Sequence, residues 1–222
     1  MSPIPKKARA VVQQTEQDTG GVDVVVNNAG YGHVGAVEEL TDDELRRQLE
    51  VNLYGVINVT RAALPYFRIR RSGRFLQMSS LNGIEALPGG AYNTASKFAV
   101  EGFSEALAAE VAHLGIGVTI VEPGPHRTSF ASAGSMRSTE PMPAYAESVG
   151  EVRQLLAQLD GNQPGDPVRA AHAIIDAATS DDPPLRLPLG SMAYDHIRAR
   201  LHQRIDELEA VATRGATDFS ST

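Results

Sequence analysis

Apolar residues along the chain alternate between short continuous runs and longer stretches in which they recur every three or four positions. The continuous runs have the length and composition of strands that are buried on both faces of a parallel sheet. The last run contains Pro188, which favours an edge strand because proline lacks the N–H that a central strand donates. The predicted strands lie at 22–26, 73–79, 117–122 and 185–189.

The stretches between these runs have the spacing of amphipathic helices. One begins at a capping box formed by Thr41 and Glu44, and another ends at the pair Gly20-Gly21. The predicted helices lie at 5–19, 42–71, 92–113, 146–159, 166–179 and 194–211. Strands that alternate with helices predict an α/β fold with a parallel sheet. We expect one domain over 1–222, with an N-terminal helix within 1–20 and a C-terminal helix and tail at 194–222.

Composition excludes several classes of function. A chain of 222 residues with 42% hydrophobic residues is long enough for one sizeable core. Its net charge of −7 argues against a surface for nucleic acid or for an anionic membrane. The chain has no cysteine, no long apolar run and no apolar signal segment, and His33 lacks a second metal ligand at suitable spacing. We therefore expect a cytoplasmic protein without a metal site.

Candidate chemistry is concentrated between residues 78 and 97. A Ser pair that ends at Ser80 follows the second predicted strand, and Tyr92 and Lys97 lie on the helix that comes next. A phenol with a pKa of about 10 is a poor acid near neutral pH, and a nearby ammonium lowers that pKa. A Ser hydroxyl beside it can hold a substrate oxygen. This division of roles is typical of acid–base catalysis on a carbonyl or an alcohol.

Four motifs, in the same order, resemble those of the short-chain dehydrogenase/reductase family. Residues 23–30 read D-V-V-V-N-N-A-G, and Asn52 lies in a V-N-L-Y-G segment. Ser80, Tyr92 and Lys97 follow, and Pro123-Gly124 precedes Thr128 in a P-G-x-x-x-T pattern. The resemblance covers nearly the whole chain, but only about the later two-thirds of a family domain. It implies a Rossmann-like three-layer sandwich.

The resemblance also implies an activity, namely hydride transfer between NAD or NADP and a small-molecule alcohol or carbonyl substrate. In that mechanism Tyr92 exchanges the proton, Ser80 positions the substrate oxygen, Lys97 lowers the Tyr pKa and contacts the ribose, and Asn52 kinks its helix and relays protons through water. Residues 125–145 would form a substrate lid, and the long helices would form a homo-oligomer interface. The implied cofactor contacts are Asn28, Ala29, Gly30, Tyr92, Lys97, Pro123, Gly124 and Thr128.

One departure from the family pattern lies in the Tyr–Lys spacing. The family has Tyr-x-x-x-Lys, whereas Tyr92 and Lys97 are five positions apart and Asn93 stands four before Lys97. Residues five apart on a regular helix are separated by roughly 140° around its axis. Three arrangements are open. A π-bulge restores the facing, Tyr92 precedes the first helical turn, or the pair is broken.

A second departure lies at the amino terminus, where only about twenty residues precede the first predicted strand. We therefore expect an N-terminally truncated family domain that lacks the glycine-rich turn for the cofactor phosphates and exposes the edge of its first strand. Residues 30–35 read G-Y-G-H-V-G, but no helix start follows directly, so we interpret them as a loop. The alternative function is that of a non-catalytic relative that acts as an interaction subunit.

Overall fold

The computed structural model describes residues 5–131, 135–212 and 214. Four parallel strands form the main sheet in the order β1-β3-β4-β6. They are β1 (Val24–Asn27), β3 (Gly73–Met78), β4 (Ile116–Pro123) and β6 (Arg186–Leu189). The helices are α1 (Lys6–Thr19), α2 (Asp42–Leu49), α3 (Gly55–Arg70), α4 (Ala91–Val111), α5 (Glu151–Leu159), α6 (Pro167–Thr179) and α7 (Ser191–Glu209). The predicted α/β fold is confirmed.

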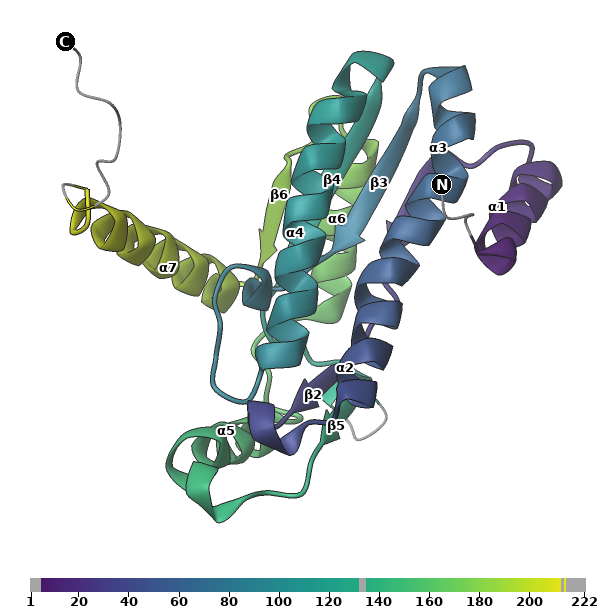
Figure 1. The fold of residues 1–222 in the computed structure, drawn as a ribbon. Helices are drawn as coiled ribbons and strands as arrows, with labels where there is room; N and C mark the ends of the chain where they lie inside the picture. Colours follow the sequence, from purple (N-terminus) through teal and green to yellow (C-terminus); the bar gives the residue numbers. More distant parts are fainter. Residues whose placement is uncertain (1–4, 132–134, 213, 215–222) are drawn as a thin grey trace, which may run out of the picture.

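Helices cover both faces of the main sheet. In Figure 1, α3 and α4 cross one face and α6 lies behind the other, which confirms the three-layer arrangement. The core between the sheet and α3 contains Phe67 and Phe75, both fully buried with ring centroids 4.8 Å apart. Helix α1 packs against α3 through Val12 and through an ion pair of 2.7 Å between Arg70 and Glu16. The predicted N-terminal helix therefore belongs to the same core.

The two edge strands differ in their exposure. Strand β6 forms one edge and contains Pro188, as predicted. Strand β1 forms the other edge and pairs on one side with β3, while its outer side has no partner strand in the described part of the chain. Val26 on β1 is 50% exposed. The edge that the sequence predicted to be open is open.

The long helix predicted for 42–71 is divided. Helix α2 ends at Leu49, a π-helical segment runs over Glu50–Tyr54, and α3 then continues. The buried Asn52 lies within the π-helical segment, which agrees with the kink that the resemblance implied. A π turn adds a residue to the helical turn and re-aims the side chains on it, and such turns are frequent at functional sites.

A second, smaller sheet was not predicted. Strands β2 (Gly32–Val34) and β5 (Met136–Ser138) pair in parallel outside the main sheet. Figure 1 shows them with α2 and α5 beyond the carboxyl ends of the main strands. Residues 30–35 thus enter a strand, so their interpretation as a loop is wrong for residues 32–34; they do not open a helix, as a dinucleotide-binding G-x-G-x-x-G turn would.

Helix α7 is buried at its start and exposed towards its end. Ala193 and Ile197 pack against Leu81 and Ile84 in the turn after β3. Figure 1 shows the rest of the helix extending away from the main sheet. Its exposed apolar side chains are Leu201, Ile205 and Leu208. Among the described helices, none combines the length and the apolar character needed to cross a membrane.

Candidate active site

Lys97 lies beneath the end of β3. Its ammonium donates a hydrogen bond of 2.7 Å to the carbonyl oxygen of Met78, the last residue of that strand. The side chain is buried, and this burial lowers the pKa of Lys97 to about 8, although the nearby Glu101 carboxylate opposes the shift. A lysine with this pKa is still mostly protonated at neutral pH but can give up its proton at little cost. It therefore suits acid–base chemistry.

Asn52 fixes the loop that follows β1. Its Nδ2 donates to the Tyr31 carbonyl oxygen at 2.9 Å and to Ser96 Oγ at 3.1 Å, and its Oδ1 accepts from the Tyr31 N–H at 3.1 Å. Gly30 lies directly beside these groups. A Cβ built there would stand 3.3 Å from Asn52 Oδ1 and 3.8 Å from Lys97 Nζ. Asn52, Lys97 and the Gly30 loop thus converge on one place.

The two serines after β3 have different surroundings. Ser79 is buried, whereas Ser80 is partly exposed. Ser80 Oγ accepts a hydrogen bond of 3.1 Å from the backbone N–H of Asn82, so its own hydroxyl hydrogen stays free to point elsewhere. Of the two hydroxyls, that of Ser80 is therefore the one that a substrate oxygen can reach.

Tyr92 and Lys97 have separate partners. Helix α4 is regular from Ala91 onward, so a π-bulge does not restore their facing, and Tyr92 lies inside the first turn and not before it. The Tyr92 hydroxyl donates to the carbonyl oxygen of Leu40 at 3.3 Å. Of the three arrangements considered, the structure shows the third. In this conformation each side chain bonds a different backbone carbonyl, Tyr92 that of Leu40 and Lys97 that of Met78.

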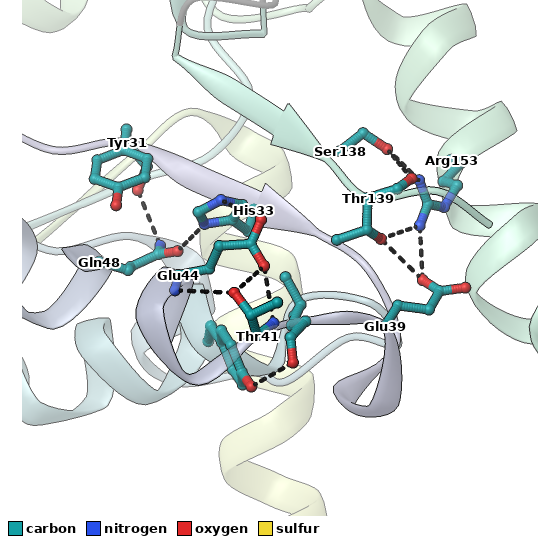
Figure 2. Close-up of polar contacts among 11 residues, drawn as sticks. Tyr31, His33, Glu39, Thr41, Glu44, Gln48, Ser138, Thr139 and Arg153 are labelled. Atoms are coloured by element: carbon teal, nitrogen blue, oxygen red, sulfur yellow. Dashed lines mark hydrogen bonds and ion pairs between the residues drawn. The ribbon is translucent and has the colours of Figure 1, made fainter. Parts of the chain in front are cut away.

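A polar network that the sequence did not reveal surrounds Asn93. Gln48 is fully buried, and its Nε2 donates to the Tyr31 carbonyl at 3.0 Å and to Asn93 Oδ1 at 3.3 Å. Its Oε1 lies 2.8 Å from His33 Nδ1, so this His nitrogen carries the proton (Figure 2). The signal was present, because Gln48 precedes Asn52 by four positions and therefore lies on the same face of the predicted helix.

The predicted cofactor loops lie at the carboxyl ends of β1 and β4. Asn28 and Ala29 are exposed. The preceding Asn27 is turned inward, where its Nδ2 donates to Gln77 Oε1 at 2.8 Å, so it holds the strand and leaves the loop free. After β4, the Gly124 N–H donates to the Leu189 carbonyl at 3.0 Å. These bonds fix where both loops leave the sheet.

Thr128 is exposed after the Pro123-Gly124 turn, and its Oγ1 accepts from the Phe130 N–H at 3.2 Å, a local loop contact. In the described part of the chain, no group of three His, Asp or Glu side chains is arranged so that it could hold a metal ion.

Comparison with known proteins shows which family this chain resembles. The family model for short chain dehydrogenase matches residues 4–138. The chain belongs to this family. The crystal structure of a short-chain dehydrogenase from Streptomyces avermitilis is 43% identical, with a TM-score of 0.87 over 96% of this chain and 77% of that one. Oxidoreductase BOA17 of Botryotinia fuckeliana is 38% identical over 185 residues, which are 83% of this chain and 67% of that protein.

A third relative is a gluconate 5-dehydrogenase from Burkholderia cenocepacia that was solved with NADP and tartrate. It is 29% identical, with a TM-score of 0.55 over 57% of this chain and 49% of that one. The chain is accordingly an oxidoreductase of the short-chain dehydrogenase type. The relatives carry names of oxidoreductases, so they do not favour the non-catalytic alternative.

The residues present fit one end of such a cofactor. The Lys97 ammonium beside the Gly30 backbone offers a donor and a close approach for ribose hydroxyls and nicotinamide. The glycine-rich residues 30–35 enter β2, so they do not offer phosphates the N–H groups of a helix start. The described residues therefore fit the nicotinamide riboside end.

Proposed function

We propose that Ser80, Lys97 and Asn52 are the catalytic group of this oxidoreductase, and that the loops at 28–30 and 123–128 hold the nicotinamide end of NAD or NADP. When bound, the cofactor supplies or accepts a hydride. The observation that carries the proposal is the place of the Lys97 ammonium, buried under the strand that leads to Ser80 and next to Gly30 and Asn52.

Each of these residues has a separate task. The Ser80 hydroxyl donates to the oxygen of an alcohol or carbonyl substrate and orients it. Lys97, with a pKa of about 8, can take up or release a proton near neutral pH. Asn52 keeps the Gly30–Tyr31 loop in place and relays protons through water. Tyr92 as the proton donor stays a prediction. It requires the hydroxyl to leave the Leu40 carbonyl.

A titration with NADH and NADPH tests the cofactor part. Nicotinamide fluorescence should show saturable binding to the purified chain, and Lys97→Met should weaken it at least about tenfold because a charge-assisted hydrogen bond is lost. Lys7→Met, which removes an exposed ammonium, is the matched control and should bind as the parent does. Absence of binding up to millimolar cofactor would refute a working cofactor site in this chain.

A carbonyl and alcohol screen tests the chemistry. Ser80→Ala should lower kcat about 100-fold with cofactor affinity unchanged, because the substrate oxygen loses its donor. If Tyr92→Phe turns over substrate as fast as the parent, the Tyr92 hydroxyl is not the proton donor. The non-catalytic alternative predicts no turnover in this screen and cofactor-independent association with another subunit.

We also propose a cytoplasmic location and a homo-oligomer. Absence of cysteine supports a reducing compartment. The exposed Leu201, Ile205 and Leu208 on α7 support self-association, because a soluble surface rarely leaves such a row open. Sedimentation at several concentrations measures the oligomer, and a monomer at every concentration would contradict it.

A further inference from the structure

Glu39 is a buried carboxylate whose partners come from separate segments of the chain. Its side chain is 2% exposed. Oε2 accepts from the Ala36 N–H at 2.7 Å and from Thr139 Oγ1 at 3.1 Å, and Oε1 accepts from the Met142 N–H at 2.7 Å. The Arg153 guanidinium donates to Oε2 at 2.7 Å. One carboxylate therefore joins residues more than a hundred positions apart.

Arg153 on α5 completes this cluster (Figure 2). One of its nitrogens donates to the Thr139 carbonyl at 2.9 Å and to Ser138 Oγ. The other donates to Thr139 Oγ1 at 2.8 Å as well as to Glu39. The guanidinium thus ties α5 and the end of β5 to the same carboxylate, and its fork geometry fixes their relative orientation.

The backbones on the two sides of this cluster lie very close together. Strand β2 pairs with β5, and the Thr139 N–H donates to the Val34 carbonyl at 3.3 Å. A Cβ built on Gly35 would stand 2.5 Å from Thr139 Oγ1, so only glycine leaves room for that hydroxyl. We call residues 31–39 the mounting segment and residues 136–142 the lid segment.

The mounting segment also contacts the active site. The backbone N–H and C=O of its first residue, Tyr31, are hydrogen-bonded to the side chain of Asn52. The ring of His33 is hydrogen-bonded to the side chain of Gln48. Its last residue, Glu39, holds the lid segment. The lid segment and Asn52 are therefore held by the same stretch of backbone.

The Glu39 contact persists over a wide pH range. The Met142 N–H, followed by the Ala36 N–H, Thr139 and Arg153, holds the pKa of Glu39 down at about 2 against the effect of burial. The carboxylate is ionised at every pH at which such an enzyme works. The contact is thus a permanent structural feature and not a pH switch.

We propose that Glu39 is a positioning residue for substrate binding, which fixes the lid segment on the mounting segment and so determines the shape of the substrate side of the site. The effect on turnover rests on the proposed function. The attachment of the lid segment does not, because it is a property of the free chain.

Hydrogen exchange of the full chain without ligand tests the attachment. In Glu39→Gln, amides of the lid segment should exchange at least about tenfold faster than in the parent, because charge-assisted bonds are lost. The Met142 amide is the direct reporter, since it donates to Glu39. Glu38→Gln is the matched control. Glu38 is the exposed neighbour that accepts from the Tyr145 hydroxyl at 2.6 Å, and its removal should leave exchange of the lid segment within about twofold.

Arg153→Met is the second variant, because it breaks the same cluster from α5 and keeps an apolar side chain. It should raise exchange of the lid segment as Glu39→Gln does, and the double variant should add little. Unchanged exchange of the lid segment in both variants would overturn the proposal. So would an equal acceleration in the main sheet and in the lid segment in both variants, because Glu39 would then act only through the stability of the whole fold.

Kinetics test the effect on substrate. With a substrate found in the screen, Glu39→Gln should raise KM about tenfold and leave kcat and cofactor affinity within about twofold. Faster exchange of the lid segment with an unchanged KM would overturn the positioning role. A parent chain without any turnover would refute the proposed function and not the attachment, which the exchange experiment measures by itself.

Discussion

Two buried glutamates, each beside one arginine, behave in opposite ways. Glu39 accepts hydrogen bonds from two backbone N–H groups, a hydroxyl and Arg153, and its pKa falls to about 2. Glu122 at the end of β4 is 1% exposed, accepts no hydrogen bond from the described residues, and lies 3.5 Å from Arg186. Burial raises its pKa to about 7, and the carboxylate of Glu101 adds to the rise.

The difference shows that burial alone does not determine the charge of a carboxyl group. Arg186 is shared, because it also lies 3.4 Å from Glu101 and 2.7 Å from the exposed Glu105. One guanidinium cannot satisfy three carboxylates, whereas Arg153 serves one carboxylate that backbone donors already hold. The number of donors decides whether a buried acid stabilises the fold or destabilises it.

The same substitution at both positions should give opposite results. Glu39→Leu should lower the melting temperature by roughly 5–10 °C, because it leaves the Met142 N–H without its acceptor and the Arg153 guanidinium without its counter-charge. Glu122→Leu should leave the melting temperature unchanged or raise it, because a poorly solvated carboxyl is removed. Calorimetry at pH 7.5 measures both. Equal losses in the two variants would contradict the contrast.

Arg186→Met should have an effect that depends on pH. At pH 8 the melting temperature should fall by roughly 3–6 °C, because Glu101 and Glu122 then repel each other without a counter-charge. At pH 5 Glu122 is largely protonated, so this repulsion is weak and the loss should stay under about 2 °C. Arg153→Met should show no such difference between pH 5 and pH 8, since Glu39 is ionised at both.

The stability of the parent chain should fall as the pH rises from about 4.5 to about 7. A carboxyl group with a raised pKa in the folded state binds its proton more tightly there than in the unfolded state, so its contribution is lost as pH approaches the folded pKa. Discounted for solvent screening, the loss from Glu122 is about 1–2 kcal/mol. Urea unfolding should show a flatter profile for Glu122→Gln. An equal slope in parent and variant would rule out Glu122 as the source.

The smallest effect is expected at Glu38, next to Glu39. Glu38→Gln should change the melting temperature by less than about 1 °C, because its bond to the Tyr145 hydroxyl is exposed and competes with water. A loss as large as that of Glu39→Leu would show that position in the chain, and not the number of donors, explains the contrast.

Local patterns predicted the strands of the main sheet and the helices that cover it well. The apolar runs gave all four strands to within about two residues, and the capping box of Thr41 and Glu44 marks the observed start of α2. Contacts between distant segments were not predictable in this way. Strands β2 and β5 have three residues each and about a hundred residues between them, so neither shows a periodicity that indicates the pairing.

The site was predicted in part for a similar reason. Lys97, Ser80 and Asn52 lie on elements whose ends meet, so motif order was enough to bring them to one side of the sheet. The direction of the Tyr92 side chain depends on the Leu40 carbonyl, which is far away in sequence. The roles of Gln48 and Glu39 depend equally on partners that only the folded backbone supplies.

The open edge of β1 has a consequence for handling the protein. On its outer side the strand presents backbone N–H and C=O groups beside the half-exposed Val26, and such an edge templates pairing with any extended segment. Light scattering by the purified chain should therefore rise more than in proportion to its concentration. The infrared spectrum should show a gain in intermolecular β structure over the same range. Val26→Lys, which places a charge on that edge, should raise its solubility limit without altering the melting temperature of the dilute protein.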